Sequence, residues 1–373
     1  MAWSTVVGQA RVKTLLRSLW EAQRLPHAML FYGPPGAGMD AMGIELARVL
    51  NCERGQWDAC GVCPSCHAID TLRHQRLSLI FAMPAKAGEK TAYDKFDEGE
   101  MAEINAEISL KAANPYHRIT IPKAQGIKVQ SIRDLRHATS FRAGAKGRNV
   151  VLIMDADRMN PNAANALLKT LEEPTGDTIL ILTTAKRESM LPTILSRCQQ
   201  VRFEALAAAD IERGLLGMYD DITPERAREA AMLSQGNYLD AQILATGDSL
   251  IPRTEIREFL LAIHQYNPRT IMKKIGSYTS VKDGKALTAF LTGIASWFRD
   301  VLAVQEGAED AISNIDMKDS IVKFASLYPD ADCTTAVTAV EETIDLIPKN
   351  VHLVTLLVVL SNRLRRCLAP YLA

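Results

Sequence analysis

A glycine-rich turn between an apolar strand and a helix is the feature that most constrains the fold of this chain. The run "AMLFY" (Ala28–Tyr32) is short and apolar and stops at Gly33, and apolar residues recur at helical spacing from Met42 onward. A glycine turn in this position is typical of a phosphate-binding loop, in which backbone N–H groups at the start of the helix surround the phosphates. The stretch therefore predicts a strand, a tight loop and a helix, in that order.

The loop itself lacks two of the side chains that a working phosphate site needs. Gly33 and Gly38 occupy the two glycine positions of the pattern G-x-x-x-x-G-K-[ST], with Gly36 between them. Met39 stands where a lysine should reach the phosphates, and Asp40 where a hydroxyl should hold magnesium. A carboxylate that faces a phosphate at about 4 Å costs about 4 kcal/mol at an effective dielectric constant of about 20. We therefore predict a degenerate nucleotide-binding site that does not bind ATP; a chance cluster of glycines is the alternative.

Two further apolar runs extend the α/β pattern. "NVVLIMDAD" (Asn149–Asp157) and "TILILTT" (Thr178–Thr184) are continuous runs of the kind found in parallel strands that are covered on both faces. The segment Asn162–Glu173 between them carries apolar residues along one helical stripe. Strands that alternate with helices predict a doubly wound parallel sheet, here over residues 1–205.

Asp155, near the end of the first of these runs, resembles the metal-side carboxylate of ATPases. Hydrolytic members of that superfamily have a glutamate next, which activates water, whereas this chain has Ala156. A turn residue at a strand end is the plainer interpretation of Asp155. Because the cation at Met39 and the water activator are missing together, we interpret the domain as a former hydrolase. An ATPase that uses Asp157 or Glu172 as its base is the alternative.

Arg197 belongs to a third motif, "LPTILSRC" (Leu191–Cys198), which follows the run "TILILTT". A lone arginine is usually a surface charge. A guanidinium fixed at a domain edge can instead reach the γ-phosphate that a neighbouring subunit holds, and so act as an arginine finger in trans. We retain the second interpretation because the nucleotide site of this chain has lost its own cation.

Four of the seven cysteines form the strongest local signal. Cys52, Cys60, Cys63 and Cys66 have the spacing C-x₇-C-x₂-C-x₂-C. Zinc takes four tetrahedral thiolate or imidazole ligands, and two-residue spacings place two sulfurs on one ion. The pattern predicts a structural Zn²⁺ site with no open position for catalysis. An iron–sulfur cluster and reduced free thiols are the alternatives.

The rest of the sequence is less specific. Residues 84–120, hereafter the insertion, are rich in Lys, Glu and Ala and predict a partly helical or mobile segment without a legible function. Residues 206–247 and 250–373 predict two all-helical domains. Lys+Arg and Asp+Glu both number 43, which weighs against an independent zinc-containing nucleic-acid binder. Neither a signal-peptide core nor a run long enough to cross a bilayer is present, and we expect a cytoplasmic protein.

Several stretches together resemble a known family. In order over residues 6–203, they are "VVGQ", "RLPHAMLFYGPPGAG", the four-cysteine segment, "DADRMNPNAANALLKTLEEP" and "LPTILSRCQQVRF". These are similar to the delta-prime subunits of the bacterial DNA polymerase III clamp loader, which are AAA+ proteins. The resemblance implies an α/β AAA+ core over residues 1–205, with a zinc module inserted at 52–66. It further implies a helical lid at 206–247 and an all-α collar domain at 250–373, whereas the insertion departs from the family pattern.

The resemblance also implies a role and partners. The chain would be a non-hydrolysing stator, without catalytic activity of its own, that supplies Arg197 to a neighbouring ATPase subunit within the DNA polymerase III holoenzyme. Its partners would be the gamma/tau and delta subunits of a hetero-pentamer, which loads a sliding clamp onto primer–template DNA without any membrane. Leu239, in "GNYLDA", stands where active subunits use an arginine to sense nucleotide. The alternative is a gamma/tau-like subunit that binds or hydrolyses ATP with a divergent loop.

Overall fold

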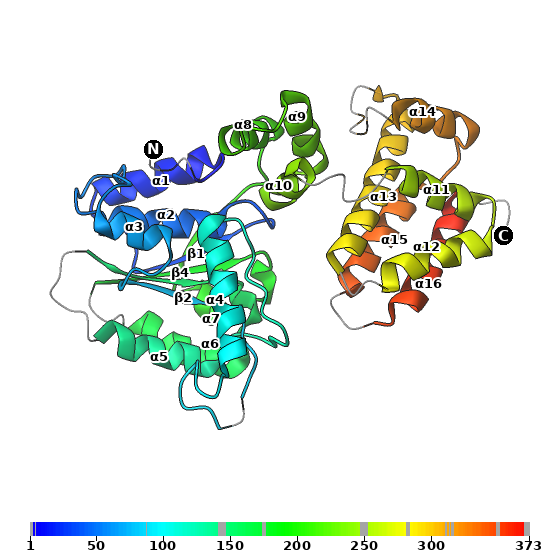
Figure 1. Ribbon diagram of the computed structural model, residues 1–373. Helices are drawn as coiled ribbons and strands as arrows, with labels where there is room; N and C mark the ends of the chain where they lie inside the picture. The colour runs from blue at the N-terminus through cyan, green and yellow to red at the C-terminus, as the bar shows by residue number, and fades with distance from the viewer. Residues whose placement is uncertain are drawn as a thin grey trace. The chain divides into compact units, whose positions relative to one another are not determined.

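The chain divides into two compact units in the computed structural model (Figure 1). Unit 1 comprises residues 1–220 and 234–241, and unit 2 comprises residues 221–233 and 242–373. The structure describes residues 3, 5–86, 88–140, 147–173, 177–246, 253–280, 284–309, 312, 314, 317–347 and 351–368. Among these residues, no helix combines the length and the hydropathy that a membrane span requires.

Unit 1 is built on a five-stranded parallel sheet with the strand order β2-β3-β4-β1-β5. The strands are β1 (Ala28–Tyr32), β2 (Leu77–Ile80), β3 (Asn149–Ile153), β4 (Thr178–Thr184) and β5 (Gln199–Arg202). Every residue of β3 and β4 is buried, as a parallel strand with both faces covered requires. The doubly wound parallel sheet that the sequence predicts is confirmed.

Helices cover both faces of this sheet (Figure 1). On one face, Gly43 of α2 lies so close to Leu152 and Ile181 that a Cβ at this glycine would come within 2.8 Å of Leu152. On the other face, α5, α6 and α7 share a core with the strands, to which Leu135, Leu167 and Ile194 contribute. The helices of this unit are α1 (Ala10–Glu21), α2 (Met39–Asn51), α3 (Pro64–Asp70), α4 (Glu98–Ala113), α5 (Val129–Ser140), α6 (Pro161–Glu172), α7 (Pro192–Leu195) and α8 (Ala208–Met218), with short 3₁₀ turns η1 (Ala156–Arg158) and η2 (Arg187–Ser189).

The strand order brings three chain segments together at the carboxyl edge of the sheet. Tyr32, the last residue of β1, pairs with Thr184 of β4, and Ile153 at the end of β3 pairs with Leu182 of the same strand. Ligands of open parallel sheets bind outside this edge, where neighbouring strands lead off in opposite directions. The glycine loop after β1, Asp155 after β3 and Thr183 of β4 therefore lie at one place.

The described part of the chain beyond β5 is helical, as the sequence predicts. Helix α9 (Pro224–Leu233) belongs to unit 2, and α10 (Tyr238–Thr246) begins in unit 1 and ends in unit 2. The remaining helices are α11 (Arg253–His264), α12 (Pro268–Ser280), α13 (Gly284–Gln305), α14 (Lys318–Leu327), α15 (Cys333–Leu346) and α16 (Leu353–Leu368). A single apolar core joins α11 to α16, with Phe259 and Phe290 in edge-to-face contact at 5.3 Å between ring centroids. The separation of a lid at 206–247 from a collar at 250–373 stays a prediction.

Candidate functional site

The glycine loop, residues 33–38, contains left-handed backbone and leads directly into α2. Gly36 and Gly38 have φ of 72° and 90°, in the left-handed region that favours glycine, and Gly38 is the N-cap of α2. Met39 is buried and faces away from solvent. The strand–loop–helix order predicted from the sequence is confirmed, whereas the assignment of Gly33, Gly36, Gly38, Met39, Asp40 and Asp155 to a degenerate nucleotide site stays a prediction.

Asp40 is held by two side chains from elsewhere in unit 1. One carboxylate oxygen accepts a hydrogen bond of 2.7 Å from the Thr183 hydroxyl of β4. The other lies 2.7 Å from Nζ of Lys111, which also donates to the carbonyl of His117 at 2.8 Å. Lys111 is 1% exposed and comes from α4, within the insertion. A lysine thus stands beside the glycine loop, although its place in the sequence lies far from the phosphate-loop motif.

Atoms from other parts of the chain lie against Gly33, Gly36 and Gly38. A Cβ at Gly36 would come within 1.7 Å of Oδ1 of Asn237, and one at Gly38 within 2.9 Å of the Tyr116 hydroxyl. A Cβ at Gly33 would come within 2.4 Å of the Phe203 carbonyl oxygen. The packing around the loop therefore leaves no room for a Cβ atom at these three glycines.

Asp155 is paired with an arginine of the insertion. Its Oδ2 atom accepts from Nε of Arg118 at 2.9 Å. Burial raises the pKa of Asp155, Arg118 lowers it, and the nearby Asp40 raises it again, with a net upward shift. Ala156 is 1% exposed and packs in the core below the sheet edge. Asp157 accepts a hydrogen bond of 2.6 Å from the Thr184 hydroxyl.

Arg197 lies at the surface of unit 1, just after α7. Its side chain is 36% exposed, and Nη2 lies 2.7 Å from the Glu172 carboxylate at the end of α6. Nη1 donates to the carbonyl of Thr193 at 3.1 Å. Glu172 is thereby paired with a cation and Asp157 with a hydroxyl, so each of the two alternative bases already has a partner in the chain.

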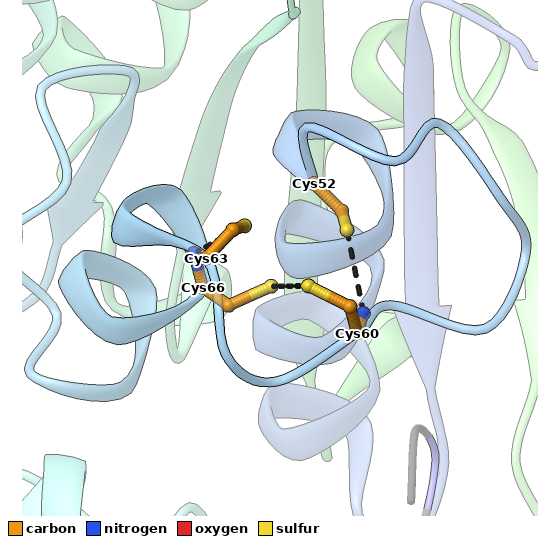
Figure 2. Close-up of side chains that lie close together, drawn as sticks. All are labelled: Cys52, Cys60, Cys63 and Cys66. Atoms are coloured by element: carbon orange, nitrogen blue, oxygen red, sulfur yellow. Dashed lines mark hydrogen bonds between the residues drawn. The ribbon is translucent and has the colours of Figure 1, made fainter.

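The four cysteines of the predicted metal site converge between α2 and α3 (Figure 2). Their sulfurs all lie within 4.8 Å of one another, and those of Cys60 and Cys66 are 4.0 Å apart. Zn–S bonds of about 2.3 Å in a tetrahedron place the sulfurs about 3.8 Å apart, so this cluster is close to the required size. The geometry fits a single metal ion with four sulfur ligands.

Backbone N–H groups lower the pKa of thiols in this cluster, and burial raises it. Hydrogen bonds from the backbone of Val62, which contributes most, and from Cys63 and Cys52 lower the pKa of the Cys60 thiol to about 6. Burial raises the pKa of Cys66. Backbone N–H groups also lie 3.3 Å from the Cys52 sulfur and 3.4 Å from the Cys63 sulfur. Donors of this kind stabilise thiolates, which are the form that binds a metal.

Comparison with known proteins assigns the chain to a family. The family described as "DNA polymerase III, delta subunit" matches residues 8–207, more than half of the 373-residue chain. A DNA polymerase III subunit delta' of Bacillus subtilis is 28% identical and covers 92% of this chain and 92% of its own length. The chain belongs to the DNA polymerase III delta-prime subunit family.

Other relatives include delta' and tau subunits of DNA polymerase III. A Pseudomonas aeruginosa DNA polymerase III subunit delta' is 34% identical over 58% of this chain and 55% of its own length. An Escherichia coli DNA polymerase III subunit tau is 29% identical over 69% of this chain and 35% of its own length. Among solved structures, a DNA polymerase III gamma subunit-related protein of Thermotoga maritima is 15% identical, with a TM-score of 0.41 over 95% of this chain and 99% of that one.

In this delta-prime family chain, the sequence motifs did not identify the three residues of the insertion that lie at the carboxyl edge of the sheet. Lys111, Tyr116 and Arg118 lie within the stretch "KAANPYHR" and match no motif. Thr183 and Thr184 at the end of β4 offered a signal in the sequence. Two hydroxyl residues at the end of a fully buried strand are expected to form hydrogen bonds with polar groups at that edge. Nothing in the sequence indicates that the partners of Asp40 and Asp155 come from the insertion.

Proposed function

We propose that this chain is the non-hydrolysing stator of a DNA polymerase III clamp loader, and that it supplies Arg197 to the nucleotide of a neighbouring ATPase subunit. One observation carries the proposal: Asp40 and Asp155, the carboxylates beside the glycine loop, are each paired with a cation of the same chain, while the side chain of Arg197 is 36% exposed. The chain would act in the cytoplasm with gamma/tau and delta subunits, and through them on a sliding clamp and primer–template DNA.

The ion pair with Glu172 is compatible with such a role. A surface salt bridge contributes at most about 1 kcal/mol, so a phosphate with more negative charge can displace the Glu172 carboxylate. Until then, Glu172 and the Thr193 carbonyl hold the guanidinium in one orientation. A planar guanidinium also forms two parallel bonds to a phosphate, which lysine does not.

Reconstitution of the loader with its partner subunits tests the proposal. We expect Arg197→Ala to lower hydrolysis at the adjacent ATP site by about 10³-fold, the lower end of the effect of an arginine finger, and to abolish clamp loading. Arg197→Lys is expected to restore little of either. The matched control is Arg213→Ala, which removes a surface arginine whose side chain is 77% exposed and pairs with Asp210.

Wild-type loading by the Arg197→Ala complex would contradict the finger role. ATP turnover by the purified chain that Asp155→Asn abolishes would instead favour the gamma/tau-like alternative. Either result is interpretable, because the two variants change separate parts of unit 1.

We also infer that the four-cysteine cluster binds Zn²⁺ as a structural ion. Cys52, Cys60, Cys63 and Cys66 supply all four ligands, which leaves no open position for a substrate or a water. Metal analysis of the purified chain is expected to find about one zinc ion per chain. Iron with visible absorbance would point to an iron–sulfur cluster instead.

A further inference from the structure

The insertion sends one short segment, residues 111–118, onto the carboxyl edge of the sheet. Lys111 at the end of α4 pairs with Asp40 at 2.7 Å, and Arg118 pairs with Asp155 at 2.9 Å. Between them, the Tyr116 hydroxyl accepts a hydrogen bond of 2.8 Å from the backbone N–H of Val7. One segment thus contacts both carboxylates that flank the glycine loop.

The same segment fills space next to the loop. The Tyr116 hydroxyl lies 2.9 Å from where a Cβ of Gly38 would be, and its ring meets Tyr238 edge-on at 4.6 Å between centroids. Asn237 stands in the same way against Gly36, and the Gly36 carbonyl accepts from the N–H of Tyr238 at 3.3 Å. In a working phosphate loop the phosphates lie against these glycines and the start of the helix.

Lys111 and Arg118 supply the positive charges that the two carboxylates beside the loop need. Asp40 and Asp155 repel each other, since Asp40 contributes to the raised pKa of Asp155. Lys111 and Arg118 bring one positive charge to each of them. Lys111 is 1% exposed, so its ammonium group is directed at protein acceptors and is not offered to solvent.

Helix α4 holds the segment in place. Asp97 and Glu100 form a capping box at its start, and Ile104 in its middle is buried. Glu107 accepts from the backbone N–H of Thr120 at 2.8 Å and lies 2.9 Å from Nε2 of His117. The helix and the returning chain are thereby tied on both sides of residues 111–118.

We propose that the insertion is a built-in occupant of the former triphosphate site: Lys111, Tyr116 and Arg118 stand beside the glycine loop and close it to nucleotide. This inference goes beyond the stator role and does not depend on Arg197. The insertion makes the nucleotide-free state of this subunit permanent, because the closing group is part of the chain.

Hydrogen exchange on the full chain tests whether the contacts hold the loop. The double variant Lys111→Met/Arg118→Gln keeps the size of both side chains and removes both charges. We expect amide exchange over residues 33–41 to become at least ten-fold faster. The matched control is Lys90→Met, which removes an exposed lysine of the same insertion and leaves the capping box of α4 and the sheet edge intact. Unchanged exchange over residues 33–41 in the double variant would overturn the proposal.

Nucleotide titration tests whether the insertion and a nucleotide exclude each other. Met39→Lys/Asp40→Ser restores the loop pattern, and Lys111→Ala/Tyr116→Ala/Arg118→Ala removes the occupant. With a fluorescent ADP and Mg²⁺ as the probe, we expect the combined protein to bind at least ten-fold more tightly than the protein with only the restored loop. Equal affinity of the two proteins, or no binding by a folded combined protein, counts against the proposal. If the combined protein does not fold, the exchange measurement decides.

Discussion

Asp155 occupies an unusual backbone conformation at the end of β3. Its φ and ψ are 50° and 52°, in the left-handed region, where asparagine and aspartate are the best tolerated residues after glycine. Its carboxylate is buried enough that the pKa rises in spite of the Arg118 guanidinium. The folded protein therefore disfavours the charged form relative to the unfolded chain.

This shift predicts a pH-dependent contribution to stability. A carboxyl with a raised folded-state pKa contributes stability that is present at low pH and lost as the pH rises through that pKa. Asp155→Asn imitates the protonated form and suits the left-handed backbone. We expect it to slow the hydrogen exchange of β3 at pH 7, with a difference from wild type that shrinks as the pH falls through the pKa of Asp155.

Asp332 provides a control of opposite sign. Thr335 donates hydrogen bonds to its carboxylate at the start of α15, and these lower the pKa of Asp332. Its stabilising effect is present above the ordinary pKa and is lost as the pH falls through the lowered one. Asp332→Asn should therefore speed exchange of α15 at pH 7 and have little effect in acid. A shift of both variants in the same direction would refute the assignment for Asp155.

At the scale of elements, the cysteine module is joined to the start of the chain by aromatic side chains. Trp57, in the loop between Cys52 and Cys60, stacks on Trp3 at 4.5 Å and meets Trp20 of α1 at 5.9 Å between ring centroids. Metal binding energy in such modules is folding energy. Loss of the proposed zinc ion should therefore destabilise the N-terminal part of unit 1.

Chelation of the metal is predicted to change tryptophan emission. Three of the four tryptophans of the chain lie in this cluster, and the fourth, Trp297, is buried in unit 2. Extraction with a strong chelator should shift the emission of the chain to longer wavelength as Trp57 separates from Trp3. A Trp57→Phe variant should lose most of that shift, and an unchanged spectrum in the wild type after metal loss would contradict the coupling.

The elements that the sequence predicted well are those whose signal lies within a short window. The loop between Tyr32 and Met39, the strand before Asp155 and the cysteine spacing are each complete within some tens of residues, and the structure contains all three. The pairing of Lys111 with Asp40 joins positions 71 residues apart and depends on where α4 crosses the sheet edge. No spacing rule reports such a contact, so the closing of the loop by the insertion could not be predicted.

At the scale of the whole molecule, unit 2 contains an apolar core of its own. The cluster runs from Ile256 to Leu368 and takes residues from each of the helices α11 to α16. A core of this kind is sufficient for independent folding when the helices that bury it are all present.

We therefore predict that residues 253–373 fold when expressed alone. Circular dichroism should show a helical protein with a cooperative thermal transition. Leu291→Ala, at a fully buried position, should lower the free energy of unfolding by about 2–5 kcal/mol. Leu261→Ala is the matched control, because that leucine is 46% exposed and should change stability by less than about 0.5 kcal/mol. A gradual, non-cooperative transition of the fragment would show that the core of α11 to α16 depends on the rest of the chain.

Asn237 and Tyr116 explain why positions 36 and 38 must be glycine even without a ligand. Any residue larger than glycine at position 36 or 38 would collide with one of these two side chains and would also strain the backbone. Mutational tolerance at these positions would thus be low even in a protein that never meets ATP. In subunits built like this one, the glycines of the loop indicate only that the surrounding side chains pack closely. The lysine and the hydroxyl that follow the glycines are what indicate nucleotide binding.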